Sequence, residues 1–314
     1  MSAVTATQSV SGTAKKRKRS KLDNSRAYYW YTIPGILAFL AVIGYPLFQN
    51  VKTSFYKWNG YNTPRFIGLD NYKNLLHDSN FWVSFGHAAQ FIFAMSIIPT
   101  VLGLLFGAIV FDFISPYFGQ AWTTYIRASL FMPQIIPITV ISILWNWLLS
   151  PNTGVFNTML KAVGIKNPPD WLGNSHTAVL AISMMLIWIQ VGYTVTIFIT
   201  GMGRIDPSLH EAAQLDGASW WQRFRVITLT QLAPEISIVI LTTAVAAIKI
   251  FAPVQIMTGG GPGNSTYVPA FYSYFNFFTT QKVGYGSAVA TVLMVILSVL
   301  AIGMFRFQNR KGAN

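Results

Sequence analysis

Hydrophobic residues along the chain gather into six long stretches separated by shorter polar segments. A membrane-spanning helix needs about 20 mostly apolar residues, and the six stretches that qualify are residues 28–49, 84–111, 128–149, 178–200, 236–257 and 284–307. Helices are expected rather than open strands, because lipid offers no hydrogen-bond partner to exposed backbone groups. The pattern therefore predicts an all-α polytopic membrane protein with six transmembrane helices over residues 28–307.

The two ends of the chain are polar. Seven of the 22 Lys and Arg residues lie between Lys15 and Arg26, behind a run of small polar residues. Residues 1–27 are predicted to be a disordered basic tail, and residues 308–314 a short C-terminal tail. Positive charge beside the first span favours a cytoplasmic N-terminus, and six spans then return the C-terminus to the cytoplasm.

Composition excludes several other classes of protein. Only 10% of residues are charged, against about 25% in soluble domains. There is no cysteine, and the four histidines at positions 77, 87, 176 and 210 form no ligand-spaced pair, so no metal site is predicted. The net charge of +13 is concentrated beside an apolar helix, which is typical of a topology signal or of contact with lipid headgroups. We expect no nucleic-acid partner.

The loop at about 201–232, between the fourth and fifth stretches, carries strong local signals. Asp206–Pro207 combines an N-cap with proline at the first helical position, and Asp216–Gly217 supplies a stop that tolerates positive φ. Ser219 and Gln222 have the spacing of a capping box. The loop is predicted to be a short helix, a bend and a second helix.

Two functions suit such a loop. A small-faced helix can dock into a groove on a partner protein. It can also lie on the membrane surface, with Trp220 and Trp221 as interfacial anchors. Composition alone leaves both open.

Residues 211–229, "EAAQLDGASWWQRFRVITL", resemble the cytoplasmic EAA motif of permease subunits of binding-protein-dependent ABC importers, within the carbohydrate-importing, maltose-type group. Four further blocks resemble the same group: "FIGLDNYKNLLHDSNFW", "RASLFMPQIIPITVISILWNWLL" followed by "NTGVFNTML", "IFAPVQIMTGGGPGNSTYVPAFYSY" and "VGYGSAVATVLMVIL". The resemblance covers nearly all of residues 28–307, and the ordered set is far more specific than the first block alone. It implies the transmembrane domain of a type I ABC importer.

The resemblance implies that the loop holds a coupling helix seated on a cytoplasmic ATPase subunit. Glu211 would face donors on that subunit, and Gly217 would provide the bend. The implied coupling residues are Glu211, Ala212, Ala213, Asp216, Gly217 and Ala218. Thr230 stands where the family usually has proline, although Pro234 follows four residues later.

The chain itself is not expected to be an enzyme. It contains no G-x-x-x-x-G-K-[ST] motif, so ATP and Mg²⁺ would bind separate partner subunits and this chain would hold no cofactor. The run Gly259–Gly263 lacks the lysine of a phosphate loop and predicts a tight turn at the outer end of the fifth span. The implied partners are a second homologous permease, two cytoplasmic ATPase subunits and an extracellular sugar-binding protein.

Polar groups inside the spans are expected to face a cavity or another helix. The resemblance puts the sugar path at Gln190 and Tyr193 in the fourth span, and at four positions in the fifth: Thr243, Ala246, Ala247 and Ile250. These four are spaced to share one helical face. Ala247 and Ile250 are apolar where the maltose-type site is polar, so the sugar and the subunit that contacts it stay open. Lys249 is predicted to lie within the fifth helix, and either to pair with the partner permease or to reach the outer surface.

We therefore predict a permease subunit in the plasma membrane of a prokaryote. It would import a di- or oligosaccharide by alternating access. The rival is an ion-coupled secondary transporter, which would need carboxylates inside the spans, whereas Asp112 and Glu235 lie only at predicted cytoplasmic ends.

Overall fold

The computed structural model describes residues 25–311, and they are predominantly helical. The chain divides into two units, residues 1–49 and 50–314. Residues 1–24, most of the predicted basic tail, lie outside the described part, as do residues 312–314. The first unit holds the helices α1 (Ser25–Phe39) and η1 (Leu40–Gly44), the latter a π-helix, and the start of α2 (Tyr45–Thr53). Together they form an apolar helix over Trp30–Thr53, long enough for the first predicted span.

The second unit opens with a small polar layer and continues into one long helical run. The layer consists of an antiparallel hairpin, β1 (Tyr56–Lys57) and β2 (Arg65–Phe66), followed by α3 (Asp70–Leu76). The helical run consists of α4 (Ser79–Ile92), η2 (Phe93–Ile97), α5 (Ile98–Ala108), η3 (Ile109–Ile114) and α6 (Ser115–Ile135).

A kink at Gly119 divides this run. The run contains 57 residues, which as a straight helix would extend about 85 Å, far beyond the roughly 30 Å core of a bilayer. Gly119 takes φ 79° inside α6, a value that glycine adopts without steric cost. The second predicted span therefore lies before the kink.

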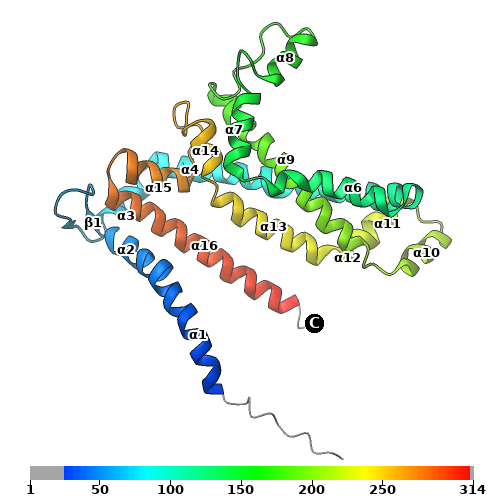
Figure 1. Ribbon diagram of the computed structural model, residues 1–314, viewed down its shortest axis with the longest axis horizontal. Coiled ribbons are helices and arrows are strands. Elements are labelled where there is room, and N and C mark those ends of the chain that lie inside the picture. The colour runs from blue at the N-terminus through cyan, green and yellow to red at the C-terminus, as the bar shows by residue number, and fades with distance from the viewer. Residues whose placement is uncertain (1–24, 312–314) are drawn as a thin grey trace, which may run out of the picture. The chain divides into compact units, whose positions relative to one another are not determined.

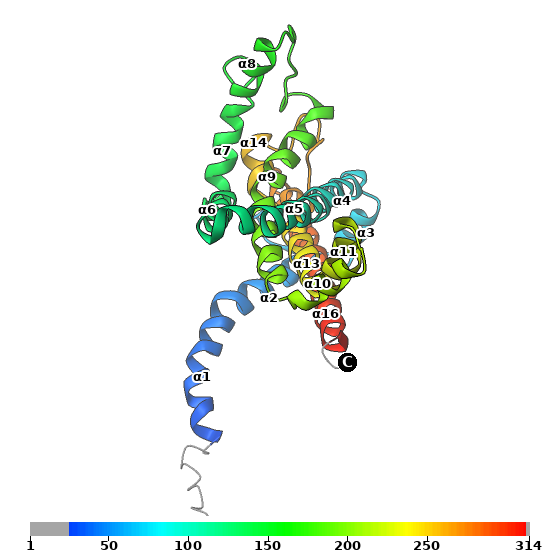
Figure 2. The same ribbon diagram turned by 90° about the vertical axis from the view of Figure 1, so that its right-hand side faces the viewer.

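The third predicted span, residues 128–149, is not one continuous helix: it is broken at Pro137, one of two prolines, with Pro133, that are expected to kink it. α6 ends at Ile135, Ile136 is extended at φ −75° and ψ 133°, and α7 (Ile138–Leu148) begins after Pro137. Proline biases the residue before it toward extended backbone and cannot donate to the carbonyl four residues back. The described residues contain four helices long and apolar enough to cross a membrane, or five if one bent pair is counted. α7 packs against α14 (Ala252–Met257), and Asn146 Nδ2 in α7 donates to the Ile256 carbonyl at 3.1 Å. The following α8 (Val155–Ala162) lies beyond the other helices of this unit (Figures 1 and 2).

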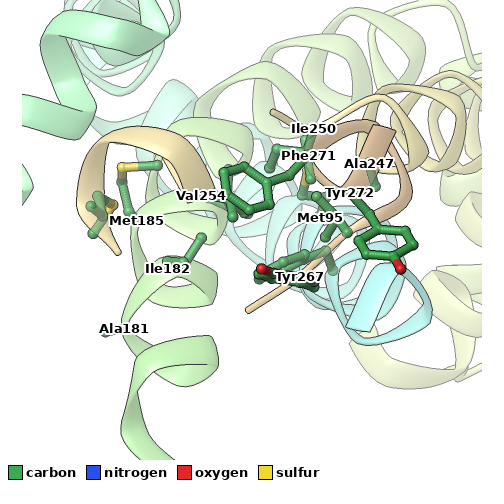
Figure 3. Close-up of a cluster of buried hydrophobic side chains, with 14 of the residues drawn as sticks. Met95, Ala181, Ile182, Met185, Ala247, Ile250, Val254, Tyr267, Phe271 and Tyr272 are labelled. Carbon is green, nitrogen blue, oxygen red and sulfur yellow. The ribbon is translucent and has the colours of Figure 1, made fainter. Parts of the chain in front are cut away.

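α9 (Ser175–Met202) is the fourth predicted span and the centre of the core. The Thr194 hydroxyl donates to the Pro99 carbonyl at 2.7 Å, which fixes α9 against α5. Figure 3 shows Ile182 and Met185 of α9 in the main apolar cluster, together with side chains from the later helices.

The fifth predicted span, residues 236–257, is also broken. α13 (Ala233–Ile248) ends at Lys249, and α14 (Ala252–Met257) begins after a non-helical Phe251. Pro253 cannot supply the N–H that a continuous helix would donate to the Lys249 carbonyl. Lys249 is therefore an exposed C-cap residue, and its predicted place inside a helix was wrong.

The chain then turns sharply and ends in a long helix. Gly259, Gly260 and Gly263 all have positive φ, so the predicted tight turn is confirmed. The remaining helices are α15 (Pro269–Tyr274), η5 (Phe275–Thr279) and α16 (Val283–Lys311). The apolar part of α16, Val283–Gly303, provides the sixth predicted span.

Candidate functional site

The loop between α9 and α13 has the local structure that its caps predict. Asp206 is the N-cap of α10 (Pro207–Leu215), and its side chain accepts the backbone N–H two residues on at 3.0 Å. Gly217 takes φ +81° at the bend. Ser219 and Gln222 form both halves of a capping box at the start of α11 (Trp220–Arg223). These predictions are confirmed.

α10 projects from the molecule with none of its residues buried. Glu211 and Ala212 are exposed, Ala213 is half-buried, and Leu215 retains 90% of its surface. Within residues 25–311, the Glu211 carboxylate has no ion pair or hydrogen bond. Figure 1 places α10 at the end of the second unit opposite α3 and α15. A helix of this length is marginal in water by itself, so α10 depends on its caps to stay helical. Its surface is left uncovered by the rest of the described chain.

The remaining implied coupling residues lie at the bend. Asp216 is the C-cap of α10, and both it and Gly217 are exposed. Ala218 is half-buried, and its N–H donates to the Ala213 carbonyl at 2.9 Å. The six residues for which the resemblance implies a coupling role thus lie on one helix and its C-terminal turn.

Trp220 fastens the second part of the loop to the body of the protein. Its indole N–H donates to Asp112 Oδ2 in η3 at 2.8 Å. Its ring lies 5.7 Å from that of Phe113 and stacks on Phe224 at 5.3 Å. Trp220 is therefore an internal anchor rather than a lipid-facing one, while its neighbour Trp221 is 54% exposed.

Two further contacts stiffen the loop. Arg223 Nη1 donates to Gln214 Oε1 at 2.8 Å and joins α11 to α10. Arg204, after α9, pairs with Glu235 in α13 at 2.9 Å. Sequence reasoning identified Asp112 and Glu235 only as carboxylates at the ends of spans. Their partners lie far along the chain or across the loop, so no local pattern points to them.

The loop enters α13 through a sharp bend. η4 (Phe224–Thr228) and α12 (Leu229–Gln231) continue α11, and this helix meets α13 at 67°. The chain turns at the buried Leu232, two residues before Pro234, while Thr230 lies inside α12.

Gln190 and Tyr193 lie near the middle of α9. Gln190 is 6% exposed, and its amide has no hydrogen-bond partner among residues 25–311. Tyr193 is half-buried and packs against a cluster that includes Phe198 and Val239. α9 therefore presents an unpaired amide and an aromatic ring one turn apart.

The four predicted positions after the coupling loop do not share one accessible face. The Thr243 hydroxyl is buried and donates to Ser96 Oγ in η2 at 2.7 Å. Ala247 and Ile250 are buried in the main cluster, and Ile250 lies beyond the end of α13. Ala246 is the exposed member of the set.

Sequence reasoning missed a polar site at the other end of the unit. Asp78, the N-cap of α4, accepts hydrogen bonds on Oδ2 from Tyr272 and from Tyr285, the latter at 2.5 Å. Burial raises the pKa of Asp78, but hydrogen bonds from the two tyrosines and from backbone N–H groups outweigh it and hold the pKa below its ordinary value. Burial and the Asp78 carboxylate raise the pKa of Tyr272 to about 12.

The apolar helices and the capped, projecting loop define a polytopic helical membrane protein with a short exposed helix between two of its spans. Residues 100–312 match the family described as "Binding-protein-dependent transport system inner membrane component", and the chain belongs to this family. The resemblance read from the motifs is confirmed.

Known relatives cover most of the chain. It is 32% identical over 281 residues to the "Probable ABC transporter permease protein YurN" of Bacillus subtilis (strain 168), covering 89% of this chain and 94% of that protein. It is 30% identical over 246 residues to the "Trehalose/maltose transport system permease protein MalF" of Thermococcus litoralis, covering 77% and 81%.

A solved structure described as "Crystal structure of bacterial alginate ABC transporter in complex with alginate pentasaccharide-bound periplasmic protein" has the same fold. The TM-score is 0.74 at 20% identity, over 91% of this chain and 94% of that one. The fold is thus that of an ABC importer transmembrane domain.

Proposed function

We propose that the chain is one of two permease subunits of an ATP-driven importer that carries a di- or oligosaccharide into the cell by alternating access. The observation that carries this proposal is α10, which is capped at its start, uncovered along its length and joined through α11 to the membrane helices. A stiff element of this kind transmits displacement from a docked ATPase better than a loop does.

Two observations support a saccharide as the transported substrate: the names of relatives, and two side chains on α9. Relatives are named for trehalose and maltose and for starch degradation products. The Gln190 amide has no hydrogen-bond partner among the described residues, and its polar atoms are not fully buried, so they are accessible to a saccharide hydroxyl. Tyr193 would supply an apolar face for a sugar ring. We propose these two residues and the exposed Ala246 as the accessible part of the path, with Thr243, Ala247 and Ile250 behind them.

The proposed assembly follows from the family. It contains a second permease, two cytoplasmic ATPase subunits that bind ATP and Mg²⁺, and an extracellular sugar-binding protein. The chain would lie in a prokaryotic plasma membrane with both termini in the cytoplasm, as the basic tail indicates. Nothing in the family or the fold favours the rival, an ion-coupled secondary transporter.

The test is to disrupt α10 and its bend without altering a span. Truncating one partner of a buried charged pair typically costs about 3–5 kcal/mol, so Glu211→Gln should weaken ATPase binding if Glu211 is buried against a partner. Gly217→Val should be more severe, because a β-branched residue resists φ +81°. Asp70→Asn, at an exposed carboxylate on α3, is the control.

The measurements are co-purification of the ATPase subunit and sugar-stimulated ATP hydrolysis. Both should fall in the two α10 variants and stay unchanged in the control, with all three proteins present in the membrane. Normal ATPase binding and coupling in both α10 variants would show that this segment is not a coupling helix.

A further inference from the structure

A polar cavity lies between the hairpin, α3, η5 and the start of α16, at the end of the second unit opposite α10 (Figure 1). Its volume is about 780 Å³, within the range of small-molecule sites. The predicted topology puts it on the outer side of the membrane. None of the residues assigned to the sugar path or to coupling lines it.

The hairpin holds two cations directly opposite each other on the cavity wall. Lys57 and Arg65 are register partners across β1 and β2, so their side chains project from the same face. Like charges in this position destabilise an antiparallel pair. Among residues 25–311, neither side chain has an ion pair or a hydrogen bond. An anion between them would remove this repulsion.

Other charges around the cavity do not neutralise the pair. Lys282 adds a third exposed cation to the lining, again without a partner in the described part of the chain. Asp78 is the one acid among the lining residues, and its Oδ2 is occupied by the two tyrosine hydroxyls and its Oδ1 by the Asn80 N–H. The cavity therefore has a net positive charge.

The rest of the lining suits a hydroxylated ligand. The Trp58 ring is held by a hydrogen bond from its N–H to the Asn62 carbonyl at 2.7 Å. The side-chain amides of Asn62, Asn74 and Gln281 line the cavity and make no hydrogen bond to any described residue. An aromatic wall with free amides provides an apolar face and hydrogen-bonding groups for a saccharide ring.

We propose that this cavity binds an anionic saccharide, with its acidic group between Lys57 and Arg65. The saccharide class rests on the proposed function, whereas the requirement for negative charge rests on the hairpin alone. The site is separate from Gln190 and Tyr193, so it would hold sugar before or apart from passage through the membrane helices. The concave shape and free amides favour a small hydroxylated anion over a lipid headgroup.

The test uses the full permease–ATPase complex in a neutral detergent and titration calorimetry with trigalacturonate, compared with the neutral maltotriose. Trigalacturonate should bind saturably, and more weakly as salt rises. Arg65→Gln should weaken binding about tenfold or more, because a charge-assisted hydrogen bond is lost. Lys73→Gln is the matched control, since Lys73 is an exposed cation on the neighbouring α3 that does not line the cavity.

Thermal unfolding provides a second measurement that does not require tight binding. Arg65→Gln should raise the Tm of the ligand-free protein, because it removes the repulsion with Lys57, and should abolish stabilisation by trigalacturonate. The proposal is overturned by equal binding of maltotriose, by unchanged binding in Arg65→Gln, or by binding to phosphatidylglycerol vesicles with none to trigalacturonate. ATP-coupled uptake of a neutral sugar, together with no binding of trigalacturonate, would refute the proposed anionic-saccharide site. It would leave the proposed importer function intact.

Discussion

The hydrogen bond between Trp220 and Asp112 should determine whether movement of the coupling loop reaches the membrane helices. Trp220→Phe removes the N–H that donates to Asp112 Oδ2 at 2.8 Å and keeps an aromatic ring beside Phe113 and Phe224. A hydrogen bond to a charged group contributes about 1.5–3 kcal/mol, so its loss should shift the balance between anchored and released α11 by about 10- to 100-fold. The ATPase should still bind, because α10 is unchanged.

The assay is sugar uptake per ATP hydrolysed in proteoliposomes. Trp221→Phe is a matched control, because Trp221 is 54% exposed and its N–H has no partner among residues 25–311. We expect Trp220→Phe to lower the ratio and Trp221→Phe to preserve it. If Asp112→Asn also lowers the ratio, the double variant should be little worse than either single one, since both remove the same bond. Equal ratios in the two tryptophan variants would refute the reasoning.

Three further predictions concern other parts of the molecule. Tyr193→Ala should reduce sugar uptake more than assembly with the ATPase, and unchanged uptake in an assembled complex would contradict the proposed path. Gly263→Cys, the single cysteine in such a variant, should react with an impermeant thiol reagent from outside, and labelling from inside only would reverse the topology. The pKa of Asp78 in the folded protein lies below the ordinary 3.8. The hydrogen bonds from Tyr272 and Tyr285 should therefore stabilise the fold fully above pH 3.8, and this stabilisation should be lost as pH falls through the pKa of the folded state. In Asp78→Asn the Tm should therefore fall less steeply at acid pH than in the unsubstituted protein. An equally steep fall would contradict this prediction.

Much of the helical content could be predicted because it depends on local pattern. The lengths of α9 and α16 follow from continuous apolar runs, and the caps of α10 and α11 follow from residues within one turn of each other. The breaks in the third and fifth spans could not be predicted from hydropathy, which does not register backbone dihedrals. Pro137 indicates the break in the third span, and Pro253 was the available signal for the break in the fifth.

The candidate sites also include features that local sequence indicates and features that it does not. The exposure of α10 is consistent with its implied docking role, because a short polar helix has little to bury. The bond between Trp220 and Asp112 joins residues 108 positions apart, and the opposition of Lys57 and Arg65 depends on hairpin register. Neither can be read from spacing, because each arises only when separate segments meet.

α13 is a separate helical segment, bounded by the 67° bend at Leu232 and by the break after Lys249. Its 16 residues give a length of about 24 Å, so a rotation of about 10° at Leu232 would carry its far end about 4 Å. The break after Lys249 lies where that displacement is largest, so α14 and the glycine turn need not follow it. A displacement of the capped loop that rotated α13 would therefore move Ala246, and the break would allow the outer layer to keep its position.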